Sequence, residues 1–122
     1  MTEKPDDSPR VSGSLAAHYA PVTPLCLVEP AQLAETVDGL RAQGKKIAVL
    51  AYGVALPSLP DGLLSRAPAD AAGFAHDLYA RLRALDRIGA DLILVEAPPN
   101  ASQWHAITDR LRRAATGSGS NG

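Results

Sequence analysis

Residues 91–99 read DLILVEAPP, and this stretch decides the fold. Its apolar residues 92–95 follow one another without alternation, which is typical of an inner parallel strand that is buried on both faces. Glu96 ends the apolar run. The prolines at 98 and 99 cannot donate the hydrogen bonds of a sheet, so the chain has to leave the sheet there. The stretch therefore predicts a buried strand at the centre of the molecule.

Helices and further strands are predicted around this strand. Asp70 is a candidate N-cap for a long helix that runs to about residue 88. Apolar residues at helical spacing line one face of that helix: Phe74, Leu78, Leu82 and Leu85. Helices are also predicted after Pro30 and after Ser102, and further strands at residues 25–28, 47–53 and 63–66. This order predicts an α/β fold, a small Rossmann-like, open, mostly parallel sheet with helices on both faces.

The length and composition predict one domain with less ordered ends. A chain of 122 residues is long enough for one core and too short for two. Residues 1–13 are polar and rich in proline, which predicts a disordered N-terminal segment. Residues 14–24 are bracketed by prolines and predict an extended surface segment. The Rossmann-like domain is expected at residues 25–115, followed by a flexible tail at 116–122.

Charge and hydropathy exclude several classes of partner. The 12 basic and 13 acidic residues nearly cancel, so no net charge attracts nucleic acid. No stretch approaches the ~20 apolar residues of a membrane span. The acidic, polar N-terminus is unlike a signal peptide, which predicts a cytoplasmic protein. Cys26 has no intrachain partner and is expected to be a small buried hydrophobic residue.

The candidate crevice lies where the predicted strands end. The carboxyl ends of parallel strands meet at one edge of the sheet, where ligands bind in open α/β folds. Glu29, Tyr52 and Glu96 each follow a predicted strand and are expected to gather there. The two carboxylates are read either as an acid/base pair or, with more weight, as residues that simply end strands in water.

Motifs for nucleotides, metals and nucleic acids are missing. Neither GxGxxG nor GxxxxGK[ST] occurs, so a glycine-rich phosphate loop is not predicted. His76 and His105 have no second ligand at helical spacing, and a zinc site is not expected. The basic cluster at residues 110–113 has no interleaved aromatic side chains apart from Trp104, so the nucleic-acid signal is weak.

Two stretches resemble a known family. SGSLAAHYAP, with Gly13, His18, Tyr19 and Pro21, resembles the interdomain linker of the two-domain threonylcarbamoyl-AMP synthases of the Sua/YciO/YrdC family. ADLILVEAPP followed by AITDRLRRAA resembles the closing strand and helix of that family's C-terminal domain. The resemblance covers about residues 11–115. Where many members have basic and aromatic residues before the histidine, this chain has Leu15-Ala16-Ala17.

The resemblance implies a role in a larger enzyme. The family makes L-threonylcarbamoyl-adenylate from threonine, bicarbonate and ATP, for the threonylcarbamoyladenosine modification of tRNA. Catalysis, with ATP and Mg, belongs to a YrdC-like domain that this chain is too short to contain, so the chain alone is expected to be inactive and to hold no cofactor. Residues 14–24 are then the linker that covers the active site of that catalytic domain.

Two alternatives stay open at this stage. Tyr19 is expected either to close the neighbouring active site or to pack against its own domain. The domain as a whole is expected either to regulate or cover a catalytic partner domain, or to be a free-standing module whose crevice takes a small ligand or a protein.

Overall fold

The structure is a computed structural model that describes residues 19–119. Its four strands form one sheet in the order β1-β4-β2-β3, and every neighbouring pair is parallel. This sheet confirms the predicted α/β fold, with the apolar run of residues 92–95 in an inner strand. The strands are β1 (Leu25–Val28), β2 (Ile47–Ala51), β3 (Leu64–Arg66) and β4 (Leu92–Glu96).

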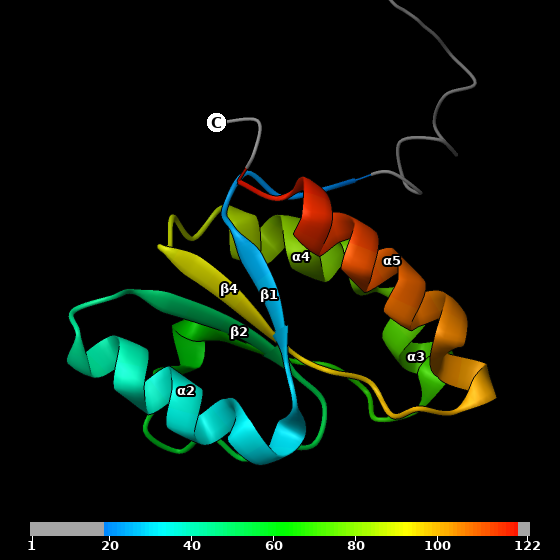
Figure 1. Cartoon of the computed structure of the whole chain (residues 1–122), viewed down its shortest axis with the longest axis horizontal. Coiled ribbons are helices and arrows are strands. Elements are labelled where there is room, and N and C mark those ends of the chain that lie inside the picture. The colour runs from blue at the N-terminus through cyan, green and yellow to red at the C-terminus, as the bar shows by residue number, and fades with distance from the viewer. Residues whose placement is uncertain (1–18, 120–122) are drawn as a thin grey trace, which may run out of the picture.

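Helices cover both faces of the sheet, as predicted (Figure 1). One face carries α2 (Pro30–Ala42), and Gly44 after it takes the positive φ of 87° that suits a helix stop. None of the helices described between residues 19 and 119 is long and apolar enough to cross a membrane. The other face carries α3 (Ala71–His76), α4 (Leu78–Asp86) and α5 (His105–Gly117), and short 3₁₀ turns lie at Asp61–Leu63 and Ser102–Trp104.

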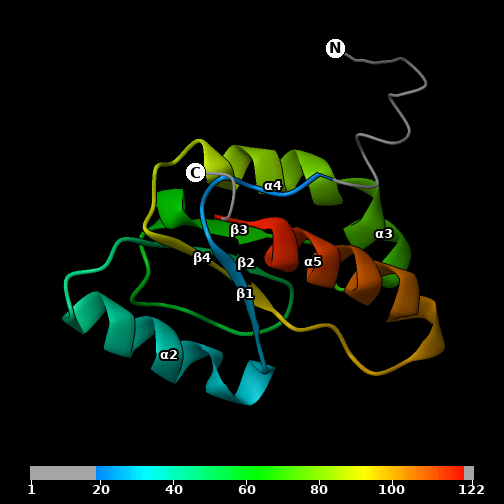
Figure 2. The ribbon, with the colours of Figure 1, turned by 45° about the horizontal axis from the view of Figure 1, so that its top comes forward.

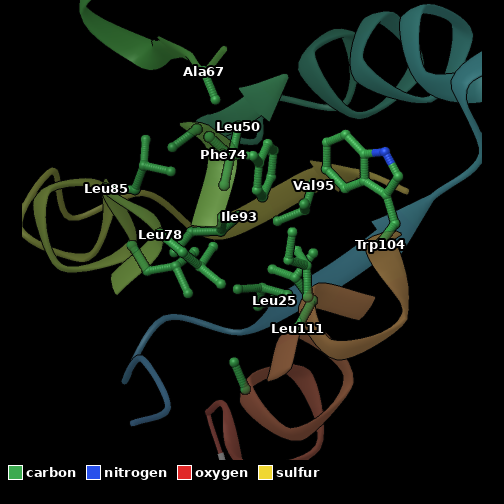
Figure 3. Packing of buried hydrophobic residues seen from close by; sticks show 14 residues of the cluster. Leu25, Leu50, Ala67, Phe74, Leu78, Leu85, Ile93, Val95, Trp104 and Leu111 are labelled. Carbon is green, nitrogen blue, oxygen red and sulfur yellow. The ribbon is translucent and has the colours of Figure 1, made fainter. Parts of the chain in front are cut away.

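The sheet divides the core into two layers of unequal size. Side chains of β4 alternate between them, since Ile93 and Val95 face α3, α4 and α5 while Leu94 faces α2. Figure 3 shows the larger layer, in which Phe74 and Trp104 fill the space above Val95. Both faces of β4 are therefore dry, which explains its unbroken apolar sequence.

The predicted long helix is wrong in one respect, because it is two helices. Asp77 leaves the helical conformation with φ −108° and ψ 9°, and α4 begins after it. Aspartate favours helix ends over helix interiors because its short carboxylate competes for nearby backbone groups. The N-cap was predicted correctly, since the Asp70 carboxylate accepts a hydrogen bond from the Gly73 amide at 2.8 Å.

The prediction that Cys26 is buried is also wrong. Cys26 is exposed, whereas its neighbour Leu25 is buried under α5. The reason is the strand order, which places β1 at an edge of the sheet. The side chain of Cys26 lies on the face that α2 covers, and α2 packs over β4 and β2 rather than over the edge strand.

Both ends of the described chain contact the domain. Residues 19–24, called here the entry segment, pack along α4 (Figure 2). At the other end α5 runs to Gly117, and the Ser118 hydroxyl accepts a hydrogen bond from the Leu25 amide at 2.8 Å. The Gly119 amide donates to the Pro21 carbonyl at 3.3 Å. Ser118 and Gly119 thus contact the start of β1 and the entry segment.

Candidate functional site

The strand order creates a switch point between β1 and β4. These neighbouring strands are parallel, yet the chain leaves β1 for α2 on one face and leaves β4 for α5 on the other (Figure 1). In open α/β sheets the two connections diverge at such a point and leave a crevice outside the carboxyl ends of the strands. A cleft of about 740 Å³ lies at this position, and we call it the switch-point cleft.

The switch-point cleft has an apolar base, and prolines lie in both of the connections that border it. Its apolar lining comes from the end of β1, the start of α2 and the turn after β4, and comprises Leu27, Pro30, Ala97, Pro98 and Pro99. Three of these five residues are prolines, whose fixed φ reduces the conformational freedom of both connections. The apolar base therefore needs little ordering before it can contact a ligand.

Tyr52 forms part of the lining and is held in one orientation. Its hydroxyl donates a hydrogen bond to the Ala97 carbonyl at 2.8 Å. Its ring lies 5.5 Å from the ring of Trp104 and 6.0 Å from that of Phe74, measured between centroids. Burial, followed by the nearby charges of Glu96 and Glu29, raises the pKa of Tyr52. The hydroxyl therefore stays protonated, and its oxygen remains free to accept a second hydrogen bond.

Glu96 lies beneath the cleft and not in it. Its side chain is only 2% exposed. One carboxylate oxygen accepts hydrogen bonds from the amides of Tyr52, Gly53 and Val54, at 2.9, 3.0 and 3.1 Å. Glu96 therefore does not simply end its strand in water, as one of the two readings of the strand-end carboxylates had it. Glu96 instead fixes the turn after β2 to the end of β4.

Charged and polar side chains stand on the walls of the cleft. Glu29 is exposed on the β1–α2 side, as expected for a residue at the strand end. The opposite wall is α5, which contributes residues that the sequence did not single out as a site. Together with Asn100 they are His105, Thr108, Asp109 and Arg112. The four α5 residues recur at i, i+3, i+4 and i+7, a spacing that places them on one side of the helix.

The wall charges are not all neutralised. Asp109 forms an ion pair with Arg113 at 3.1 Å, and the His105 ring lies 3.4 Å from the Asn100 side-chain oxygen. Within residues 19–119, the side chains of Glu29 and Arg112 make no hydrogen bond or ion pair. The cleft thus presents one unneutralised anion and one unneutralised cation on opposite walls.

A second cluster holds the entry segment at the other end of the sheet, where β1 begins. The Asp86 carboxylate accepts hydrogen bonds from the Val22 amide at 3.1 Å, the Thr23 amide at 2.9 Å and the Thr23 hydroxyl at 2.7 Å. The Tyr19 hydroxyl adds a longer bond of 3.3 Å. Burial alone would raise the pKa of Asp86, but the bonds from Thr23, Val22 and Tyr19 outweigh it and lower that pKa.

Tyr19 packs against its own domain. Its ring meets the Tyr79 ring edge-on at 6.1 Å, and the Arg83 guanidinium lies 6.0 Å from its centroid. Burial and the charge of Asp86 raise the pKa of Tyr19 to about 12. Pro21 is buried beside it. The two other residues predicted for the linker site, Gly13 and His18, lie outside the described residues.

Metal ligands do not gather in the part of the chain that the structure describes. Among residues 19–119 no group of three or more His, Cys, Asp or Glu side chains could hold an ion.

Two solved structures resemble this fold. The crystal structure of P. abyssi Sua5 complexed with L-threonine is 26% identical, with a TM-score of 0.68 over 82% of this chain and 30% of that chain. A P. abyssi Sua5 variant, in which a histidine and the tyrosine after it are replaced by alanine, is 25% identical, with a TM-score of 0.67 over 79% and 28%. The chain thus spans less than a third of either protein.

A comparison with curated proteins gave no significant match. The sequence model of the threonylcarbamoyl-AMP synthase C-terminal domain matches residues 1–116, which is nearly the whole chain. The chain belongs to the family of threonylcarbamoyl-AMP synthase C-terminal domains.

Proposed function

We propose that this domain is the accessory, regulatory part of an L-threonylcarbamoyladenylate synthase, a nucleotidyltransferase of the cytoplasm. The full enzyme would make threonylcarbamoyl-AMP from threonine, bicarbonate and ATP for the threonylcarbamoyladenosine modification of tRNA. A YrdC-like catalytic domain, normally in the same chain, would bind threonine, ATP and Mg. The observation that carries this proposal is the family match over residues 1–116.

Residues 14–24 would be the linker that covers the active site of that catalytic domain. Support comes from the P. abyssi Sua5 variant altered at an adjacent histidine and tyrosine. His18-Tyr19 is the one such dipeptide in this chain. The contacts of the entry segment with Asp86 are compatible with this role, because they are exposed or partly buried and can open when the linker moves onto the partner domain.

The proposal is tested by measuring threonylcarbamoyl-AMP formation from threonine, bicarbonate and ATP. The purified chain alone should form none, because the residues described here include no phosphate loop or metal cluster. Adding the chain to a separately supplied YrdC-like domain should change the rate or the yield of intact product. Product formation by the chain alone would contradict the assignment of catalysis to the partner domain, and an unchanged rate and yield would contradict the accessory role.

The covering role has its own variants. His18→Ala or Tyr19→Ala should reduce the effect of the chain on the partner domain, since a shortened side chain would no longer exclude water from the active site. Arg110→Ala, on the exposed side of α5, is the matched control and should leave the effect intact. An unaltered effect in both linker variants would assign these residues to packing only.

A further inference from the structure

Opposite charges line the switch-point cleft at different places, Glu29 beside α2 and Arg112 on α5. The Glu29 carboxylate, a hydrogen-bond acceptor, stands at the turn from β1 to α2. Tyr52 packs against Trp104 and gives its hydroxyl hydrogen to the Ala97 carbonyl, so its oxygen can only accept. Burial, then the charge of Glu96 and then that of Glu29 raise the pKa of Tyr52, so Glu29 acts on this side chain from nearby. On the α5 side stands Arg112, a donor with no acceptor capacity. One end of the cleft therefore suits a cation and the other suits an anion.

The middle of the cleft suits an uncharged group. Leu27, Ala97 and the prolines supply its apolar surface, and the volume of about 740 Å³ falls in the ~300–1,000 Å³ range of small-molecule sites. The surface is also fixed in shape, since Glu96 holds three amides of the adjoining turn. A ligand would thus meet two separated charges with a preformed apolar base between them.

From this geometry we propose that the switch-point cleft binds a free α-amino acid with an uncharged side chain. Arg112 binds the ligand carboxylate, and Glu29 with the Tyr52 oxygen accepts from the ligand ammonium group. This site lies on the accessory domain and is separate from the catalytic site proposed for the partner domain. It gives the domain a ligand through which the amino-acid supply could regulate the enzyme.

Phosphate-bearing ligands fit the cleft less well. Phosphate sites in α/β folds use a glycine-rich turn whose amides point at the ligand, and here the turn from β1 to α2 is Glu29-Pro30. Pro30 has no amide hydrogen, and the Glu29 carboxylate repels an anion at that helix start. A nucleotide would also place two or more negative charges beside one arginine and two carboxylates.

The test is a titration of the isotopically labelled 122-residue chain, followed by the amide resonances of the cleft. The probes are free amino acids with uncharged side chains, L-alanine, L-leucine and L-threonine among them, each added alone. Acetate, methylammonium and AMP are titrated separately. Amino acids should shift the amides of Tyr52, Ala97 and Thr108 with saturation, and each half of the zwitterion should bind at least tenfold more weakly.

Two variants and two controls decide the assignment. Arg112→Gln and Glu29→Gln should each weaken amino-acid binding at least tenfold, about 1.4 kcal/mol. Arg110→Gln on α5 and Glu35→Gln on α2 remove the same charges outside the cleft and should bind as the parent does. The proposal is overturned if no amino acid shifts the cleft amides or if all four variants bind alike. Saturable AMP binding without amino-acid binding would overturn the ligand class.

Discussion

Two carboxylates at opposite ends of the sheet do similar work in different surroundings. Glu96, at the carboxyl end of β4, binds three amides of the turn after β2 and is 2% exposed. Asp86, at the end of α4, binds two amides and two hydroxyls of the entry segment and is partly exposed. In both cases one carboxylate accepts hydrogen bonds from backbone amides that lie far away in the sequence.

The two carboxylates differ in how easily water can replace their hydrogen bonds. The Glu96 carboxylate is 2% exposed and its bonds to the turn are partly buried, so losing this carboxylate leaves without an acceptor three amides that water reaches poorly. At Asp86 water can take over the bonds, and the entry segment can leave without exposing the sheet. The comparison indicates that Glu96 belongs to the fold itself, whereas Asp86 is a reversible attachment for the linker.

The largest effect is expected when a carboxylate is placed one residue before Glu96. Val95→Asp puts the charge into the apolar layer that contains Phe74 and Trp104, where Val95 is 0% exposed. The loss should be several kcal/mol, comparable with the whole stability of a small domain. A thermal melt followed by circular dichroism should show no cooperative transition. A melt close to that of the parent would mean that β4 is not buried on both faces.

Glu96→Ala should come next. It removes the acceptor from three amides in a site that water reaches poorly, at a cost of about 3 kcal/mol. Urea unfolding of the variant measures this loss, and Glu35→Ala on the exposed side of α2 is the control, with a change within about 0.5 kcal/mol. Equal stabilities of the two variants would contradict the role given to Glu96.

Asp86→Ala should release the entry segment and leave the sheet intact. The expected loss of stability is about 1–2 kcal/mol, since solvent replaces part of the lost hydrogen bonding. Amide hydrogen exchange should become fast at Val22 and Thr23 while Ile93 and Leu94 stay protected. Asp109→Ala, which breaks an exposed ion pair on α5, should change neither region. Loss of protection throughout the sheet would show that Asp86 supports the core as well.

The same attachment should loosen in acid. The pKa of Asp86 is lowered in the folded protein, so its contribution is complete above the ordinary value of 3.8 and is lost as the pH falls through the lower folded pKa. The amide resonances of Val22 and Thr23 should move with an apparent pKa below 3.8. Asp86→Asn should abolish this titration. A midpoint above 3.8 would contradict the sign of the shift.

The smallest effect is expected for Tyr19→Phe. The variant keeps the ring contacts with Tyr79 and Arg83 and removes only the 3.3 Å bond to Asp86, so stability should change by no more than about 0.5 kcal/mol. Differential scanning calorimetry compares it with Tyr19→Ala, which also loses the ring and should melt lower. Indistinguishable melting of the Ala and Phe variants would show that the ring contributes nothing to docking.

The sequence predicted the parts of this molecule that depend on local patterns. The apolar run of residues 92–95 identified the buried strand, and Asp70 and Gly44 marked a helix start and a helix stop because caps act within one turn. Strand order was not predicted, and the error at Cys26 follows from that gap. A run of four apolar residues has the same sequence pattern whether the strand lies at the centre or at the edge of a sheet.

The candidate site was predicted in part for the same reason. Glu29 and Tyr52 were expected at the strand ends, where the cleft lies, since this edge follows from parallel topology. The hydrogen bonds of Glu96 could not be predicted from the sequence. The amides that it binds follow β2, and they meet Glu96 only because β4 and β2 are neighbours in the sheet. Asp86 binds Thr23 across 63 positions of the chain, a distance at which no local pattern carries information.

The placement of β4 between β1 and β2 also constrains how the chain can fold during its synthesis. Leu25 pairs with Ile93, and Ile47 pairs with Leu92, so β1 has no strand neighbour and β2 lacks one of its two neighbours until residue 92 has left the ribosome. Before then the β2–β3 pair is the part of the sheet that can form. Such long-range closure is slow, because the entropy of the loops is lost before the contacts form. The nascent chain therefore exposes its apolar strands for most of its translation, and the larger layer closes only when α5 has followed β4.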